Sequence, residues 1–239
     1  MPFFISALLI LVGLYTHRVV EESPVFAEES ETERAVSKTP LRELFTRHWT
    51  QLLIAVGARF GSDATFYVFG MFTLVYVTEF LHAPRDVALN GVIAGGIAQL
   101  IGIPFFGWLS DRLGRKPVLM MGIAGCLVWS FIHFRLIGTL DPTLVMVAVF
   151  VGLFLHSATW APIAAFLSEL FDTQVRYSGT AVGFQLAAVA GGAIAPIIAT
   201  AVAVSMTGGL AISIYVAIIM LIGLVTVGMT RETRDRSFV

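Results

Sequence analysis

The sequence predicts an all-α, polytopic membrane protein with about seven transmembrane helices. Hydrophobic residues make up 57% of its 239 positions and charged residues only 13%, whereas soluble domains carry about 45–50% and about 25%. Several apolar runs reach the roughly 20 residues that a helix needs to cross a bilayer. Backbone polar groups cannot stay unpaired in lipid, so a spanning segment is a helix or part of a closed barrel. Because the runs are much longer than barrel strands, we expect helices.

Seven apolar segments follow one another along the chain. They cover about 2–16, 51–81, 89–110, 117–137, 143–169, 180–204 and 208–229. The first segment is short and begins directly after Met1, without the basic stretch that opens a signal peptide. We interpret it as a transmembrane helix whose beginning is missing, with a signal anchor as the alternative.

One long polar segment, 17–50, separates the first helix from the other six and is interpreted as a linker of mixed charge. Thr39 and Pro40 are suited to start a short surface helix there, because proline is favoured in a first helical turn. The other loops are short, so neighbouring helices should pack antiparallel. The predicted parts are a truncated helix at 1–16, the linker at 17–50, a six-helix unit at 51–229 and a tail at 230–239.

Lysine and arginine are spread unevenly over the loops, and the positive-inside rule places the richer loops in the cytoplasm. This rule puts the linker and the carboxyl terminus inside and the amino terminus outside, in a plasma or inner membrane. Arg85 and Arg135 then lie outside, and Arg59 lies within a span. The basic residues inside are Arg18, Arg34, Lys38, Arg42, Arg47, Arg112, Arg115, Lys116, Arg176, Arg231, Arg234 and Arg236.

A charged loop between two apolar runs, Gly107–Pro117, reads GWLSDRLGRKP. Gly114 suits a left-handed turn after a helix end, and Pro117 suits the first turn of the next helix. We therefore expect a tight helix–turn–helix link. A second charged loop, Glu169–Gly179, should lie at the same face of the membrane.

The two charged loops together form a candidate gate at the cytoplasmic ends of the helices. We expect Arg112 or Arg115 to pair with Glu169, and Asp111 to pair with Arg176 or with a helix amino terminus. Such pairs can hold the helix ends together in one state and release them in another. The alternative is that the basic residues serve only the positive-inside rule. The candidate gate residues are Gly107, Asp111, Arg112, Gly114, Arg115, Glu169 and Arg176.

The pattern G-x-L-x-D-R-x-G-R-K within Gly107–Pro117 resembles the signature loop of the major facilitator superfamily of secondary transporters. Further stretches resemble the metabolite–proton symporter branch, which includes transporters of shikimate, 2-oxoglutarate, citrate and proline/betaine. These stretches are Glu22–Phe26 (ESPVF), Glu169–Phe171 (ELF), Val175–Gly179 (VRYSG), Gly183–Ala187 (GFQLA) and Gly191–Pro196 (GGAIAP). The resemblance implies helices six to twelve of a twelve-helix transporter. It also implies proton coupling, alternating access, and a missing amino-terminal half or a partner chain.

Polar residues inside the apolar segments are the candidates for a substrate and proton path, because a charge within a span is costly and marks a functional site. Arg59 and Asp63 are four residues apart and share a helical face, which Tyr67 continues. Arg59 can hold a substrate carboxylate, and Asp63 can exchange a proton. The alternatives are a self-neutralising structural pair or an Arg59 that snorkels.

Two further polar residues belong to the same candidate path. His156 lies near the middle of its span and is either a proton relay or a hydrogen-bonded core histidine. Gln185 is placed either to bind substrate or to bridge two helices.

The function that we expect is proton-coupled symport of a small, polar, anionic metabolite by alternating access. A non-transporting remnant or a membrane assembly partner is the alternative. The net charge of −1 gives no reason to expect a nucleic-acid partner, and the single Cys126 allows no disulfide or zinc framework within the chain. The sequence has no metal-ligand cluster, nucleophile elbow or phosphate loop, so neither an enzyme nor a cofactor is expected.

Overall fold

The computed structural model describes Tyr15, residues 40–172, 175–205 and 208–230, and Glu232. The predicted helix at 1–16, apart from Tyr15, and the predicted linker up to residue 39 lie outside the described residues. In the described part all regular structure is helical, which confirms the all-α membrane fold class.

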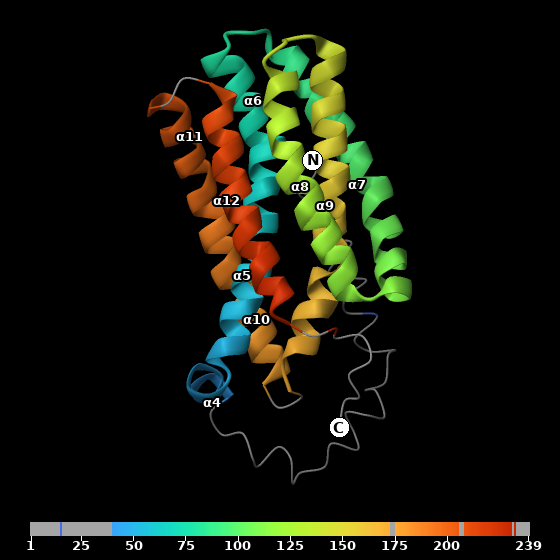
Figure 1. Cartoon of the computed structure of the whole chain (residues 1–239), viewed down its shortest axis with the longest axis vertical. Helices are drawn as coiled ribbons and strands as arrows, with labels where there is room; N and C mark the ends of the chain where they lie inside the picture. The colour runs from blue at the N-terminus through green and yellow to red at the C-terminus, as the bar shows by residue number, and fades with distance from the viewer. Residues whose placement is uncertain (1–14, 16–39, 173–174, 206–207, 231, 233–239) are drawn as a thin grey trace. The chain divides into compact units, whose positions relative to one another are not determined.

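Six helices of the described part are long and apolar enough to cross a membrane, and each coincides with one predicted apolar segment. They are drawn as near-parallel rods in Figure 1. The first span joins α5 (Trp49–Phe66), η1 (Tyr67–Phe72), α6 (Thr73–Val75) and η2 (Tyr76–Phe80). The next three spans are the single helices α7 (Arg85–Leu113), α8 (Arg115–Ile137) and α9 (Pro142–Leu170). The fifth span joins α10 (Arg176–Ala187), η3 (Ala188–Ile194) and α11 (Ala195–Ser205), and the sixth is α12 (Gly209–Gly228). A short helix precedes them, α4 (Pro40–Arg47), and it begins at the predicted proline.

Side-chain caps and glycine turns mark where the helices begin and end. At the start of α9 the Asp141 carboxylate accepts from the amides of Thr143 at 2.9 Å and Leu144 at 3.0 Å, so it caps two of the amides that have no partner within the helix. Between α7 and α8, Gly114 has φ +105°, a region that favours glycine, as the sequence predicts. Its amide donates to the Ser110 carbonyl at 3.1 Å. The chain therefore turns sharply between two long antiparallel helices.

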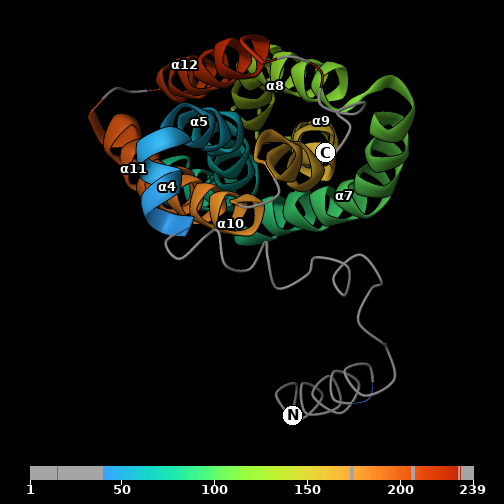
Figure 2. The ribbon, with the colours of Figure 1, turned by 90° about the horizontal axis from the view of Figure 1, so that it is seen from below.

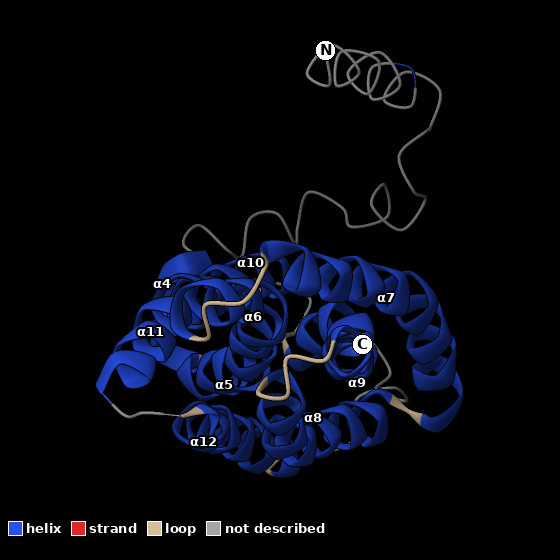
Figure 3. Cartoon of the chain, turned by 90° about the horizontal axis from the view of Figure 1, so that it is seen from above, coloured by secondary structure: helices blue, strands red, loops and turns tan. Residues whose placement is uncertain are grey.

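Two helices, α5 and α9, form the middle layer of the bundle. Viewed along the helix axes, they lie between α12 and α8 on one side and α10, α11 and α7 on the other (Figures 2 and 3). The closest packed pairs include α7 with α9, α8 with α9, α12 with α8, and α5 with both α12 and α10. Side chains on the inner faces of α5 and α9 are therefore enclosed by neighbouring spans. The end of the bundle that carries α4, at the bottom of Figure 1, is called the α4 end below.

Close contact between spans depends on glycine at two places. A Cβ on Gly191 in η3 would lie 2.4 Å from the Phe60 carbonyl oxygen of α5, and one on Gly102 in α7 would lie 2.7 Å from the Ser157 hydroxyl of α9. Small residues let membrane helices approach this closely, because packing rather than the hydrophobic effect holds them together. These contacts bring the walls of the site described next within reach of one another.

Candidate functional site

A buried ion pair lies on the inner face of α5. Arg59 and Asp63 are each only 7% exposed. The Arg59 Nε lies 3.1 Å from Asp63 Oδ2, and its Nη2 donates to Asp63 Oδ1 at 3.3 Å. Their spacing of four residues places the two groups one turn apart on the same face. The pair is electrically neutral as a unit, which lowers the cost of keeping both charges away from water.

Aromatic rings from two other spans lie close to the Arg59 guanidinium. Its Cζ lies 3.7 Å from the ring centre of Phe184 in α10 and 5.3 Å from that of Trp160 in α9. A planar guanidinium stacks well on such rings. The Arg59 guanidinium is therefore held among the spans of the bundle. Its Nη1 makes no hydrogen bond to the described residues, so part of the guanidinium edge remains open.

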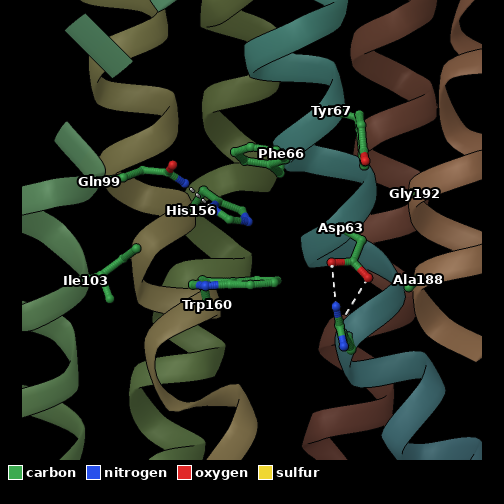
Figure 4. Close-up of a pocket in the computed structure, with 10 residues that line it drawn as sticks. Asp63, Phe66, Tyr67, Gln99, Ile103, His156, Trp160, Ala188 and Gly192 are labelled. Carbon is green, nitrogen blue, oxygen red and sulfur yellow. Dashed lines mark hydrogen bonds and ion pairs between the residues drawn. The ribbon is translucent and has the colours of Figure 1, made fainter. Parts of the chain in front are cut away.

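A pocket of about 360 Å³ lies beside this pair (Figure 4). Four of the six spans contribute to its wall. Its lining residues are Arg59, Asp63 and Phe66 from α5, Tyr67 from η1, Gln99 and Ile103 from α7, His156 and Trp160 from α9, and Ala188 and Gly192 from η3. Among the described residues, no group of three or more His, Cys, Asp or Glu side chains is placed to bind a metal ion.

His156 sits at the centre of a polar network that joins three spans. Its Nε2 is 3.0 Å from the Ser62 hydroxyl, and its Nδ1 is 3.0 Å from Nε2 of Gln99. The Ser62 hydroxyl is also 2.7 Å from that of Thr159. An amide nitrogen donates, so Nδ1 accepts from Gln99 and the ring proton on Nε2 goes to Ser62. The ring is thus both hydrogen-bonded in the core and part of the pocket wall.

The predicted path residues are not all brought together. Arg59, Asp63, Tyr67 and His156 line the pocket, whereas Gln185 is exposed on another side of α10 and does not. The preceding residue on that helix, Phe184, is the one that faces Arg59. Sequence reasoning also missed Gln99, although a polar residue in the apolar run 89–110 was a usable signal.

The α4 end carries a second cluster of charges, centred on Arg115 at the start of α8. Its guanidinium pairs with Asp111 and lies 3.6 Å from Glu169 at the end of α9, measured from Nε to Oε1. It also donates to the Ser110 hydroxyl at 3.0 Å. Arg115, one of the two expected arginines, thus meets Glu169, and it joins α7, α8 and α9.

The other candidate gate residues take different partners from those expected. Asp111 pairs with Arg115 rather than with Arg176. The Arg176 side chain donates a hydrogen bond to the Phe171 carbonyl at 3.4 Å. Arg112 stacks on Trp108 with 4.2 Å between its Cζ and the ring centre. A Cβ added to Gly107 would meet open space. Of the predicted gate residues, Asp111 and Glu169 are both joined to Arg115 by ion pairs.

Glu232, which sequence reasoning missed, closes the α4 end. Its carboxylate accepts from the backbone amides of Arg115 at 2.9 Å and Lys116 at 3.2 Å, so it caps the amino terminus of α8. In return the Lys116 ammonium donates to the carbonyls of Gly228, at 3.0 Å, and Thr230 at the end of α12. A Cβ on Gly114 would lie 2.6 Å from this carboxylate. Two helix ends thus cap each other beside the Arg115 cluster.

Comparisons with known proteins match almost the whole chain to transport proteins. Residues 7–239 match the family model described as sugar (and other) transporter. The chain is similar to the inner membrane metabolite transport protein YhjE of Escherichia coli, with 30% identity over 99% of this chain and 54% of that protein. It is 31% identical to the Escherichia coli shikimate transporter, over 98% of this chain and 54% of that protein. It is 29% identical to the proline/betaine transporter of Salmonella typhimurium, over 98% and 48%. The chain spans about half the length of these curated relatives.

Proposed function

Because this chain belongs to the sugar (and other) transporter family of the major facilitator superfamily, we propose that it carries a small, anionic metabolite across the inner membrane together with a proton. The observation that carries the proposal is the buried Arg59–Asp63 pair in the wall of a pocket shared by four spans. Buried ionisable residues within a membrane protein commonly mark the path of a substrate or an ion.

Charge balance supplies the argument for coupling. The empty site is neutral, because the charge of Arg59 cancels that of Asp63. A bound substrate carboxylate would leave it with one negative charge in a poorly hydrated place, which is costly. A proton taken up by Asp63 restores neutrality and leaves Arg59 to hold the substrate carboxylate through paired hydrogen bonds. Substrate and proton are then favoured together rather than separately.

The Arg115 cluster is the gate in this proposal. Arg115 holds the ends of α7, α8 and α9 through Asp111 and Glu169, and it must lose some of these contacts if the spans move apart. The α4 end is rich in arginine and lysine, which supports a cytoplasmic position. The proposed topology has the carboxyl terminus inside and the amino terminus outside.

Transport also needs a second set of helices in this proposal. The matched relatives are about twice as long as this chain, and secondary transporters commonly place their substrate between two repeats. We expect the facing wall to come from an amino-terminal half or from a partner chain. A remnant without transport, or a subunit that only assembles with another membrane protein, remains the competing function.

The test is uptake of radiolabelled organic anions into cells that express the protein, with and without an imposed pH gradient. Replacing Arg59 by alanine should abolish gradient-driven uptake while the amount of protein in the membrane stays unchanged. The matched control is Arg85→Ala, an exposed arginine at the far end of α7, which should transport normally. Normal uptake by Arg59→Ala would remove Arg59 from the site. Absence of uptake by the unaltered protein with any anion would favour the competing function.

A further inference from the structure

We propose that α4 is a membrane-surface helix. Its exposed apolar face enters the bilayer surface at the α4 end, and its arginines bind the headgroups of acidic phospholipids. This property concerns lipid rather than cargo, so it holds whatever substrate the protein carries. Three features support it: the direction of α4, the apolar side chains that the bundle leaves uncovered, and the arginines beside them.

The axis of α4 runs across the bundle rather than along it. Figure 1 shows α4 (Pro40–Arg47) nearly end-on, whereas Figure 2, which looks along the long helices, shows it lengthwise. The first span begins directly after it, at Trp49. Because the spans cross the bilayer, a helix that lies across their ends lies in the plane of the membrane, at the level of its surface.

One face of α4 is apolar, and the bundle covers only part of it. Leu41, Leu44 and Phe45 share this face, because residues three and four apart lie on the same side of a helix. Leu44 is completely buried in the core, where α4 packs against α5 and α10. Leu41 and Phe45 remain 53% and 55% exposed. An apolar face beside polar residues is typical of helices that lie between lipid and water.

The uncovered apolar surface continues into the first span. Trp49 and Leu53, in the first turns of α5, are 56% and 59% exposed. Tryptophan is enriched where the hydrocarbon of a membrane meets the headgroups. Leu53 lies one turn further along the span, at a depth where acyl chains are found. The lipid contact that we expect for the span can therefore extend onto Leu41 and Phe45 of α4.

Two arginines flank the apolar face of α4. At about 100° per residue, Arg42 lies beside Phe45 and Arg47 lies beside Leu44, and both arginines are exposed. The Arg47 Nη1 is 3.4 Å from the Glu43 Oε1, whereas Arg42 forms no ion pair within the described part of the chain. Two arginines and one glutamate leave α4 with one net positive charge.

The surface of an acidic bilayer matches both parts of this face. Acyl chains can receive Leu41 and Phe45, and arginine stems can lie along apolar surface while their guanidinium groups reach phosphate. Anionic lipids attract basic residues that lie close to a membrane. A protein cover over the same face is the competing occupant, and the experiment separates the two.

The experiment places the fluorophore bimane on α4 of the full chain and measures which quencher reaches it. Phe45→Cys carries the label on the apolar face, and Thr46→Cys carries it on the polar face, at an exposed position. The unaltered chain is the labelling blank, because Cys126 is completely buried. The protein is reconstituted into vesicles of phosphatidylcholine and phosphatidylglycerol in equal amounts, with bromine on the acyl chains of one lipid at a time. Acrylamide is the water-soluble quencher.

Brominated lipid should quench the label at Phe45→Cys several-fold more than the label at Thr46→Cys, and acrylamide should give the reverse order. At Phe45→Cys, the relative binding constant of the two lipids should favour phosphatidylglycerol about five-fold, as one arginine near a charged surface contributes. Arg42→Gln should remove this preference, whereas Arg85→Gln, at the far end of α7, should retain it. Leu41→Cys gives a second label position on the apolar face if Phe45→Cys does not fold.

Three results would overturn the inference. Quenching of the apolar-face label by acrylamide alone would place that face in water. Protection from both quenchers would mean that protein covers it. Equal quenching by the two brominated lipids would show contact with the bilayer without recognition of acidic headgroups. None of these results depends on uptake, so the proposed transport keeps its own test.

Discussion

At the scale of single residues, the pocket shows which side chains a sequence can identify and which it cannot. Arg59 and Asp63 stand out because charged residues interrupt an apolar run, and their spacing predicts the pair that the structure contains. Phe184 cannot be identified in this way, since an aromatic residue in an apolar helix is unremarkable until α10 is placed against α5. The polarity of Gln185 predicts a place in the path, yet the direction of its side chain depends on the rotation of α10, which the sequence pattern does not determine.

Ser62 offers a residue-scale test of the His156 network. Replacing Ser62 by alanine leaves the Nε2 proton of His156 without its partner, whereas the Thr159 hydroxyl keeps its hydrogen bond to the His156 carbonyl. Stranding buried polar groups costs about 1–3 kcal/mol, so we expect a lower midpoint of thermal unfolding. The single Cys126 is completely buried, and its reaction with a thiol-specific fluorophore reports that midpoint.

The control for this test is Ser168→Ala. Within the described part of the chain the Ser168 hydroxyl donates only to the Ala165 carbonyl of its own helix, at 2.8 Å, so its removal should change the midpoint little. Equal effects of the two substitutions would mean that the His156 network contributes no special stability.

At the scale of elements, the six spans could be predicted because each contains an apolar run long enough to cross a bilayer. An apolar run marks only the part of a helix that lies in the hydrocarbon of the bilayer. The backbone hydrogen bonds of the helix continue beyond that part into polar residues. For this reason α7 runs over Arg85–Leu113 rather than the predicted 89–110. The π-helical turns η1, η2 and η3 cannot be recognised in the sequence, because their i→i+5 hydrogen bonds require no change in residue composition.

The contact between η3 and α5 gives a test at this scale. In Gly191→Ala the added Cβ would lie 2.4 Å from the Phe60 carbonyl oxygen, so the two spans must move apart. Overpacking of this kind costs about 1–3 kcal/mol, and thermal unfolding monitored by Cys126 should shift downward.

Gly96→Ala is the matched substitution, because a Cβ there meets nothing within 4 Å. Alanine is favoured over glycine inside a helix by about 1 kcal/mol, so this variant should be as stable as the parent or more so. A Gly191→Ala protein as stable as Gly96→Ala would show that η3 and α5 are not tightly packed.

The mutual capping of α8 and α12 gives a second element-scale test. Glu232→Ala removes the carboxylate that accepts from two amides at the start of α8, and loss of such a cap costs about 0.5–2 kcal/mol. The same unfolding assay should detect it, with Glu79→Ala as an exposed control. No sequence pattern indicates this contact, because its partners are more than a hundred residues apart.

At the scale of the whole molecule, the bundle places its charges at opposite ends and one neutral pair in its interior. The distribution of lysine and arginine predicts which end is cytoplasmic. The connected gate residues Asp111, Arg115 and Glu169 lie at the α4 end. The charge pattern predicts that Arg112 or Arg115 pairs with Glu169, whereas the pairing of Asp111 with Arg115 follows only once the helices are placed.

Labelling of introduced cysteines tests the orientation, since the native Cys126 is buried. Thr139→Cys lies between α8 and α9 and Asp172→Cys between α9 and α10, both at exposed positions. In intact cells a membrane-impermeant thiol reagent should label Thr139→Cys, and it should reach Asp172→Cys only after the membrane is permeabilised. The reverse pattern would invert the proposed topology.

The neutrality of the Arg59–Asp63 pair has an electrical consequence. A membrane potential does work of about 2.3 kcal/mol per 100 mV on each elementary charge that crosses the bilayer. The empty site carries no net charge, and in the proposed cycle a carboxylate and a proton load it without adding any. Neither the loaded nor the empty site is then driven by voltage, so the work available for accumulation would come from the difference in pH and not from the potential.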